Sequence, residues 1–97
     1  MRVVRFRSVA DAEVAEALTW YHGRSPEAAR HLVAALEAAV DAIVAGPERF
    51  PQVSSTLRRV AVPGFPYRLY YRLFPTTISI VGCVHVRRDP RVWQRRG

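Results

Sequence analysis

The sequence has 97 residues, of which 49% are hydrophobic, and a formal net charge of +7. This length supports one hydrophobic core and a single domain over residues 1–97, and is too short for two domains. No apolar run approaches the roughly 20 residues that a membrane span needs. Cys83 is the single cysteine, which excludes an internal disulfide. We therefore expect a cytoplasmic protein in a reducing compartment.

The basic residues are all arginine, and they are unevenly distributed along the chain. Residues 1–48 hold five arginines against seven acidic residues, whereas residues 49–97 hold ten arginines against one aspartate. Such an asymmetry creates a directional electric field that favours phosphate groups or an acidic polypeptide. Two explanations without a functional role remain. A GC-rich coding sequence disfavours lysine, and the basic face can be merely solvated.

The N-terminal segment predicts a strand and then a helix. Residues 2–6 alternate charged and apolar side chains, as a short strand does. Ser8 is the expected N-cap of the following helix. Its apolar face is built on Val14, Leu18 and Tyr21 at helical spacing,.

A second helix follows after a short connection. Gly23 is the expected end of the first helix, and Ser25-Pro26-Glu27 begins the next in the preferred order of cap, proline and acid,. Gly46-Pro47 ends it. A connection this short predicts an αα-hairpin. Its two apolar stripes are expected to form core rather than a groove for a partner.

The second half changes to the two-residue period of strands. Strands are predicted at 57–62, 67–73 and 77–86, with proline-containing turns at 63–66 and 74–76,. Short connections make neighbouring strands antiparallel. The predicted fold is α+β, in the order β-α-α-β-β-β. The helical hairpin packs on one face of a small antiparallel sheet.

Strand parity predicts which side chains lie on the sheet face away from the helices, here called the far face. The apolar sets that should face the helices are Val60 and Val62; Tyr67, Leu69, Tyr71 and Leu73; and Ile78, Ile80, Val84 and Val86. The opposite parity carries the polar set, which comprises Arg59, Arg68, Tyr70, Arg72, His85 and Arg87, beside Ala61, Ser79, Val81 and Cys83. The prediction is therefore an arginine cluster on the far face.

The predicted cluster has the chemistry of an anion-binding surface. Guanidinium groups match phosphate and carboxylate geometry, and Tyr70 could stack on a base. His85 could act as a general acid or base beside them, or be a hydrogen-bonded histidine at a strand end. The spacing of histidine and cysteine predicts no metal site, and no phosphate-binding glycine loop is present. We expect no cofactor.

The C-terminal tail continues the basic character. Arg88 extends the predicted anion-binding set, and Asp89-Pro90 predicts a turn that directs Trp93 back over the sheet,. A large aromatic residue at such a position is more often a packing anchor than a recognition residue.

The sequence resembles the RelE/ParE superfamily of toxins from bacterial type II toxin–antitoxin systems. The resemblance covers nearly the whole chain and depends on the order and spacing of several motifs. These are Trp20-Tyr21, Pro47-Glu48-Arg49-Phe50-Pro51, Arg59, Phe65-Pro66-Tyr67, Tyr71, His85, Arg88-Asp89-Pro90 and Trp93. The superfamily fold, a strand and helical hairpin on an antiparallel sheet, agrees with the elements predicted above.

This resemblance implies a growth-inhibiting toxin of the plasmid-stabilisation type. A cognate antitoxin, encoded beside it, would hold it inactive, and the complex would bind operator DNA through the antitoxin. An acidic, partly disordered antitoxin segment would suit the basic far face.

The superfamily contains two mechanisms. ParE-like members poison DNA gyrase and need no catalytic residues, and the Phe65-Pro66-Tyr67 strand and the Arg88-Asp89-Pro90 tail favour this branch. RelE-like members cleave mRNA on the ribosome, for which His85 and Arg68 would be catalytic, with Arg59 and Arg87 or Arg88 beside them. The lysines common in that set are absent from this sequence. A third alternative, from charge alone, is a non-toxic nucleic-acid-binding module.

Overall fold

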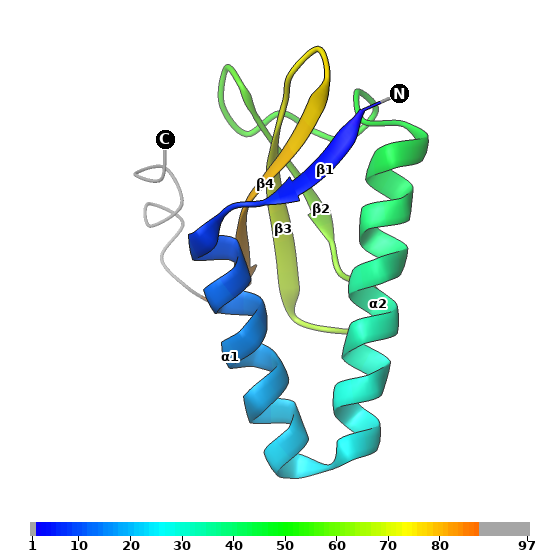
Figure 1. Cartoon of the computed structure of the whole chain (residues 1–97), viewed down its shortest axis with the longest axis vertical. Coiled ribbons are helices and arrows are strands. Elements are labelled where there is room, and N and C mark those ends of the chain that lie inside the picture. Colours follow the sequence, from blue (N-terminus) through cyan, green and yellow to red (C-terminus); the bar gives the residue numbers. More distant parts are fainter. Residues whose placement is uncertain (1, 88–97) are drawn as a thin grey trace.

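The computed structural model describes residues 2–87 and contains the six elements in the predicted order (Figure 1). They are β1 (Val3–Phe6), α1 (Ser8–Arg24), α2 (Pro26–Ala45), β2 (Leu57–Ala61), β3 (Tyr67–Leu73) and β4 (Thr77–His85). The strand order in the sheet is β1-β4-β3-β2. The predicted α+β fold class is therefore confirmed.

The sheet is mixed rather than wholly antiparallel. The β2-β3-β4 meander is antiparallel, as its short turns dictate,. β1, however, pairs in parallel with β4, with Val3 opposite Thr77 and Phe6 opposite Ile80. The sequence could not predict this orientation, because no short turn joins these two strands.

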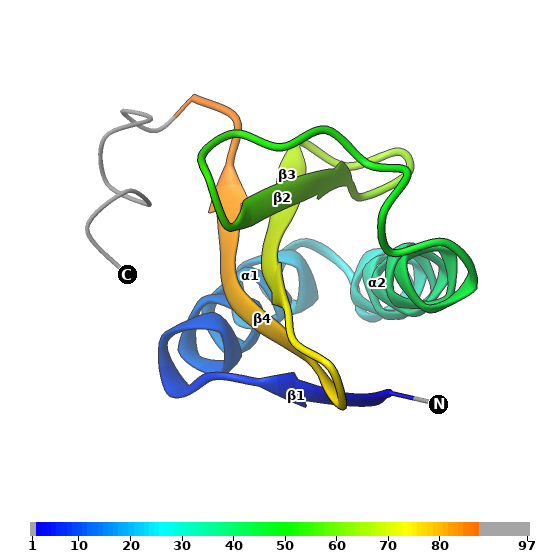
Figure 2. The ribbon, with the colours of Figure 1, turned by 90° about the horizontal axis from the view of Figure 1, so that it is seen from above.

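The two helices cover one face of the sheet. Figure 2 shows both of them on the same side of β2, and residues of both helices belong to one core with the sheet. The buried centre is formed by Leu32 and Ile43 of α2 against Leu69, Tyr71 and Ile80 of the sheet. Val14, Leu18 and Tyr21 of α1 pack against this core, as predicted. Neither helix has the length and apolar content that crossing a membrane would require.

The helix ends differ slightly from the prediction. Ser8 is the first residue of α1 rather than its cap, and Arg7 stands at the N-cap without a side-chain capping bond. The helix continues one residue past Gly23. Ser25 does cap α2, because its Oγ accepts a hydrogen bond from the amide of Ala28 at 2.9 Å.

We expect Ser25→Ala to lower the free energy of unfolding by about 1 kcal/mol, the usual cost of removing a serine cap. Urea denaturation monitored by circular dichroism measures this loss. Ser54→Ala, at an exposed position outside the helices, is the matched control and should change little. Equal losses in the two variants would contradict a capping role for Ser25.

A β-bulge in β4 changes the predicted parity of that strand. Tyr71 lies opposite Ile80 but Tyr70 lies opposite Gly82, so β4 carries one extra residue, Val81, at this point. An extra residue of this kind moves every later side chain to the other face. The predicted sheet face of each β4 side chain is therefore correct up to Val81 and wrong beyond it.

Four residues of β4 and its end are corrected. Cys83 belongs to the core under the helices, and His85 lies on the same face, opposite Tyr67. Val84, predicted to face the helices, lies on the far face. Val86, predicted to be buried, is 45% exposed.

The far face carries a small hydrophobic cluster of its own. It consists of Leu57, Tyr70, Val81 and Val84, with Val53 packed against it. Tyr70 is on the predicted face but only 3% exposed. Its ring is therefore not available to stack on a base, and that part of the prediction is wrong.

Candidate functional site

The predicted anion-binding residues lie in three separate places. Arg59 and Arg68 line one cleft at the β2 edge of the sheet. Arg72 lines a second depression, near the start of α1. His85 and Arg87 line a third pocket, on the helix side. Arg88 and the predicted turn and packing of the tail lie outside the described residues.

The arginine cleft has a volume of about 370 Å³ and is lined by Phe50, Pro51, Arg59, Val60, Ala61 and Arg68. Arg59 lies opposite Tyr70, and Arg68 lies opposite Ala61. The two arginines are thus diagonal neighbours on the far face, a relation that places Cβ atoms about 7 Å apart. Both side chains are partly exposed. Two arginine side chains that line one cleft can bind the same phosphate or carboxylate,.

The loop between α2 and β2 supplies the other wall of the cleft. Arg58 Nη1 donates to the carbonyl oxygens of Glu48 at 2.9 Å and Phe50 at 2.7 Å. The Tyr71 hydroxyl donates to the carbonyl oxygen of Pro47 at 2.6 Å. The amide of Arg59 donates to the carbonyl of Pro51 at 3.3 Å. These bonds fix the backbone of 47–51 and thereby hold Phe50 beside the two arginines.

Tyr71 stands on the helix side of β3 and is completely buried. Burial raises the pKa of its hydroxyl above the usual 10.0, and the nearby charges of Arg58 and Arg49 partly oppose this rise,. The hydroxyl is therefore a neutral donor to Pro47 throughout the physiological range.

The residues that line the cleft are suited to binding an anion,. Among the described residues that line it there is no nucleophile, histidine or carboxylate. Arg49 extends the basic rim, with its guanidinium 5.0 Å from the centre of the Phe50 ring. A partner that brings negative charge and one flat or apolar group would match this surface.

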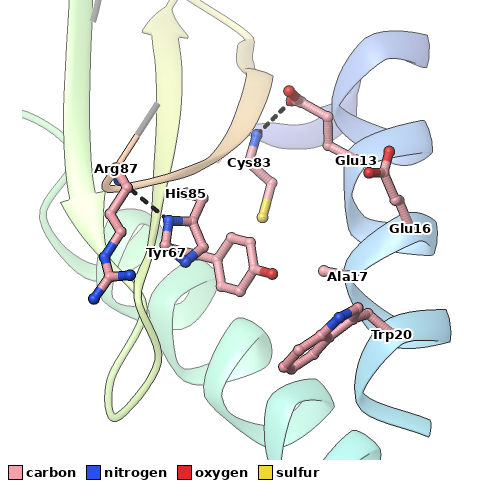
Figure 3. A pocket seen from close by; sticks show the side chains of 8 residues that line it. All are labelled: Glu13, Glu16, Ala17, Trp20, Tyr67, Cys83, His85 and Arg87. Atoms are coloured by element: carbon pink, nitrogen blue, oxygen red, sulfur yellow. Dashed lines mark hydrogen bonds between the residues drawn. The ribbon is translucent and has the colours of Figure 1, made fainter. Parts of the chain in front are cut away.

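The histidine pocket, of about 290 Å³, lies on the other side of the sheet (Figure 3). Glu13, Glu16 and Trp20 of α1 form one wall, and Tyr67, Cys83 and His85 of the sheet face them. A carboxylate oxygen of Glu13 accepts a hydrogen bond from the Cys83 amide at 2.9 Å. This bond satisfies a β4 amide beyond Ile80, where the pairing with β1 ends.

Two contacts position the His85 side chain in this pocket. Its ring is 5.3 Å from that of Tyr67, centre to centre, in an edge-on arrangement. Its Nδ1 accepts a hydrogen bond from the Arg87 amide at 3.1 Å. The histidine therefore faces two glutamates of α1, and the sheet separates it from Arg68. A phosphate bound between Arg59 and Arg68 would not reach it.

Several residues that shape these sites were not predicted from the sequence. Glu13 was expected only as an acidic residue near the start of the first helix, where it complements the helix dipole. Glu16 carried no expectation, and no local pattern connects either residue with His85. For Arg58 a signal did exist. It shares strand parity with Val60 and so falls among the residues that face the helices, where an arginine needs buried acceptors. The loop carbonyls of Glu48 and Phe50 are those acceptors.

Both the sequence and the fold of this chain are similar to those of known proteins. Residues 4–90 match the family described as the ParE toxin of the type II toxin–antitoxin system parDE. Among solved structures, the chain is similar to one described as the chromosomal ParDE toxin–antitoxin system from P. aeruginosa, with a TM-score of 0.75 and 17% sequence identity. The match covers 88% of this chain and 96% of that one. No curated protein matches the sequence significantly.

Proposed function

Because this chain belongs to the ParE toxin family of type II toxin–antitoxin systems, we propose that it inhibits growth by poisoning DNA gyrase. A cognate acidic antitoxin would neutralise it by covering the arginine cleft. The observation that carries this proposal is the cleft itself, in which Arg59 and Arg68 stand beside Phe50 without an acidic neighbour in the lining.

The character of the cleft supports a binding role rather than a chemical one. A poison acts by stabilising one state of its target and needs no reacting group of its own. Two arginines suit either the gyrase-bound DNA backbone or an acidic surface of the enzyme. They suit an acidic antitoxin segment equally, which explains how one surface can serve toxicity and its neutralisation.

The position of His85 gives no support to the alternative of an mRNA endonuclease. Such a reaction needs a general acid or base within hydrogen-bonding reach of the phosphate. Here the histidine lies in a pocket with Glu13 and Glu16. Negative charge at that position would repel an RNA phosphate.

The direct test is a cleavage assay with purified protein, gyrase and supercoiled plasmid. We expect linear DNA to accumulate after detergent and protease treatment. The double variant Arg59→Gln/Arg68→Gln should need a roughly ten-fold or higher concentration for the same cleavage, which corresponds to about 1.4 kcal/mol of binding. The control Arg5→Gln/Arg30→Gln removes the same charge at two exposed positions elsewhere and should behave as the parent does.

Three outcomes would overturn the proposal. Unchanged supercoiling and no cleaved DNA would exclude gyrase as the target. New mRNA ends in expressing cells, lost in His85→Ala, would identify a nuclease instead. Growth that is unaffected, together with DNA binding that falls steeply with salt, would leave the non-toxic nucleic-acid-binding module.

A further inference from the structure

The arginine cleft has more apolar surface than an anion alone requires. Three residues of its lining, Phe50, Pro51 and Ala61, have apolar side chains that are at least partly exposed. Phosphate and carboxylate groups are bound through charge and hydrogen bonds, to which these side chains contribute nothing. A ligand that also brings an apolar group would therefore use the whole cleft rather than its two guanidinium groups only.

The two arginines of the cleft are available to a ligand. On the same strands, Arg58 and Arg72 donate to acceptors of the protein itself, the loop carbonyls and the Thr56 hydroxyl. Within residues 2–87, by contrast, no hydrogen bond or salt bridge engages the guanidinium group of Arg59 or Arg68. The lining also contains no acidic residue. These two charges can therefore bind a carboxylate or phosphate of a partner.

Phe50 is held in a fixed position beside these arginines. Its carbonyl oxygen accepts the 2.7 Å hydrogen bond from Arg58, and its ring packs in part against the hydrophobic core. The carbonyl of the next residue, Pro51, accepts from the Arg59 amide at 3.3 Å. A side chain that is already ordered loses little conformational entropy when a partner covers it. Because the ring is only half-buried, it contacts what enters the cleft.

The surroundings of the Phe50 ring favour an apolar side chain over a nucleic-acid base. The guanidinium group of Arg49 lies over this ring, 5.0 Å from its centre. A base that stacks needs an open ring face, and Arg49 already covers one face. The backbone of duplex DNA presents phosphates and sugars, which have no apolar group for the ring. An apolar side chain can pack against the open part of the ring without a set orientation.

We propose that the arginine cleft binds the polypeptide of gyrase rather than its DNA, and that Phe50 is the specificity-determining residue. The ligand is a segment of the enzyme surface in which a carboxylate stands beside an apolar side chain. Arg59 and Arg68 bind the carboxylate, and Phe50 packs against the apolar side chain. This inference rests on the proposed function, because it names the part of the target that the same cleft contacts.

The test measures binding of the labelled full chain to gyrase without DNA and, separately, to a short DNA duplex. We expect the parent to bind gyrase in the absence of DNA. Phe50→Ser should weaken this binding roughly ten-fold or more, because an aromatic contact at the centre of an interface is lost. Phe50→Leu keeps an apolar side chain and should bind nearly as the parent does. Phe74→Ser, which removes another exposed phenylalanine, is the control and should leave binding unchanged. Thermal melting followed by circular dichroism confirms that each variant is folded at the assay temperature.

The salt dependence of the parent provides a measurement that needs no variant. Binding through one carboxylate and an apolar contact should weaken only modestly with added salt, whereas phosphate contacts release counterions and weaken steeply. Binding that requires DNA and falls steeply with salt would assign the cleft to phosphates and overturn the proposal. Equal binding by Phe50→Ser and the parent would overturn it too, while DNA cleavage by the parent would still support gyrase as the target. An absence of both gyrase binding and DNA cleavage would overturn the proposed function as well.

Discussion

Ile80→Ala is expected to lower the free energy of unfolding by about 2–5 kcal/mol, the range for emptying a core site of this size. Ile80 is completely buried and stands where both halves of the sheet meet. It lies opposite Phe6 of β1 in the parallel pair and opposite Tyr71 of β3 in the antiparallel pair. A cavity here would remove contacts from three strands at once, and neither helix can move in to fill it without losing its own packing.

Urea denaturation of the parent and variant measures this difference, provided that the slope with denaturant is unchanged. Val86→Ala is the matched control, because it removes methyl groups from a residue that is 45% exposed. It should cost about 0.5 kcal/mol or less. A loss below about 1 kcal/mol in Ile80→Ala would mean that the core is not centred on this residue.

Tyr71→Phe is expected to lower the free energy of unfolding by about 1–3 kcal/mol, because the carbonyl of Pro47 would lose its donor in a partly buried place,. The loop that carries Phe50 should loosen as a result. Hydrogen exchange of the amides of Glu48, Arg49 and Phe50 would therefore accelerate in the variant. Unchanged exchange and stability would show that the loop is held by the bonds from Arg58 and the Arg59 amide without the Tyr71 hydroxyl.

The same hydroxyl predicts a pH dependence. The pKa of Tyr71 is raised in the folded state, chiefly by burial. Its stabilising contribution is therefore complete below the unfolded-state pKa of about 10 and is lost as pH rises through the folded-state pKa. Above about pH 10 the parent should therefore lose more stability than Tyr71→Phe does. The other tyrosines are common to both proteins and cancel in the difference. Parallel pH profiles would contradict the assignment.

Local signals were enough to predict the elements of this fold. The Ser25-Pro26 start and Gly46 end of α2 are encoded by residues adjacent in sequence, and both were placed correctly. The strands of the meander were found because their two-residue period and proline turns are local as well. The mixed sheet was missed, since the β1–β4 pairing depends on residues more than 70 positions apart.

The assembly of the site was less predictable, and β4 shows why. Both faces of this strand are apolar, so a bulge at Val81 leaves no trace in the hydrophobic pattern. Strand parity alone therefore predicted that His85 and Arg68 share one face of the sheet, although in the folded chain they lie on opposite faces. Arg59, Arg68 and Arg72 do lie on the predicted face, because the pairing of β2 with β3 contains no bulge that would change the parity.

The parallel pairing of β1 with β4 also has a consequence for synthesis of the protein. Val3 precedes its partner Thr77 by more than 70 residues in the chain. Contacts of such long sequence separation form late, because closing the intervening loop is entropically costly. β1 therefore cannot join the sheet until β4 has been synthesised.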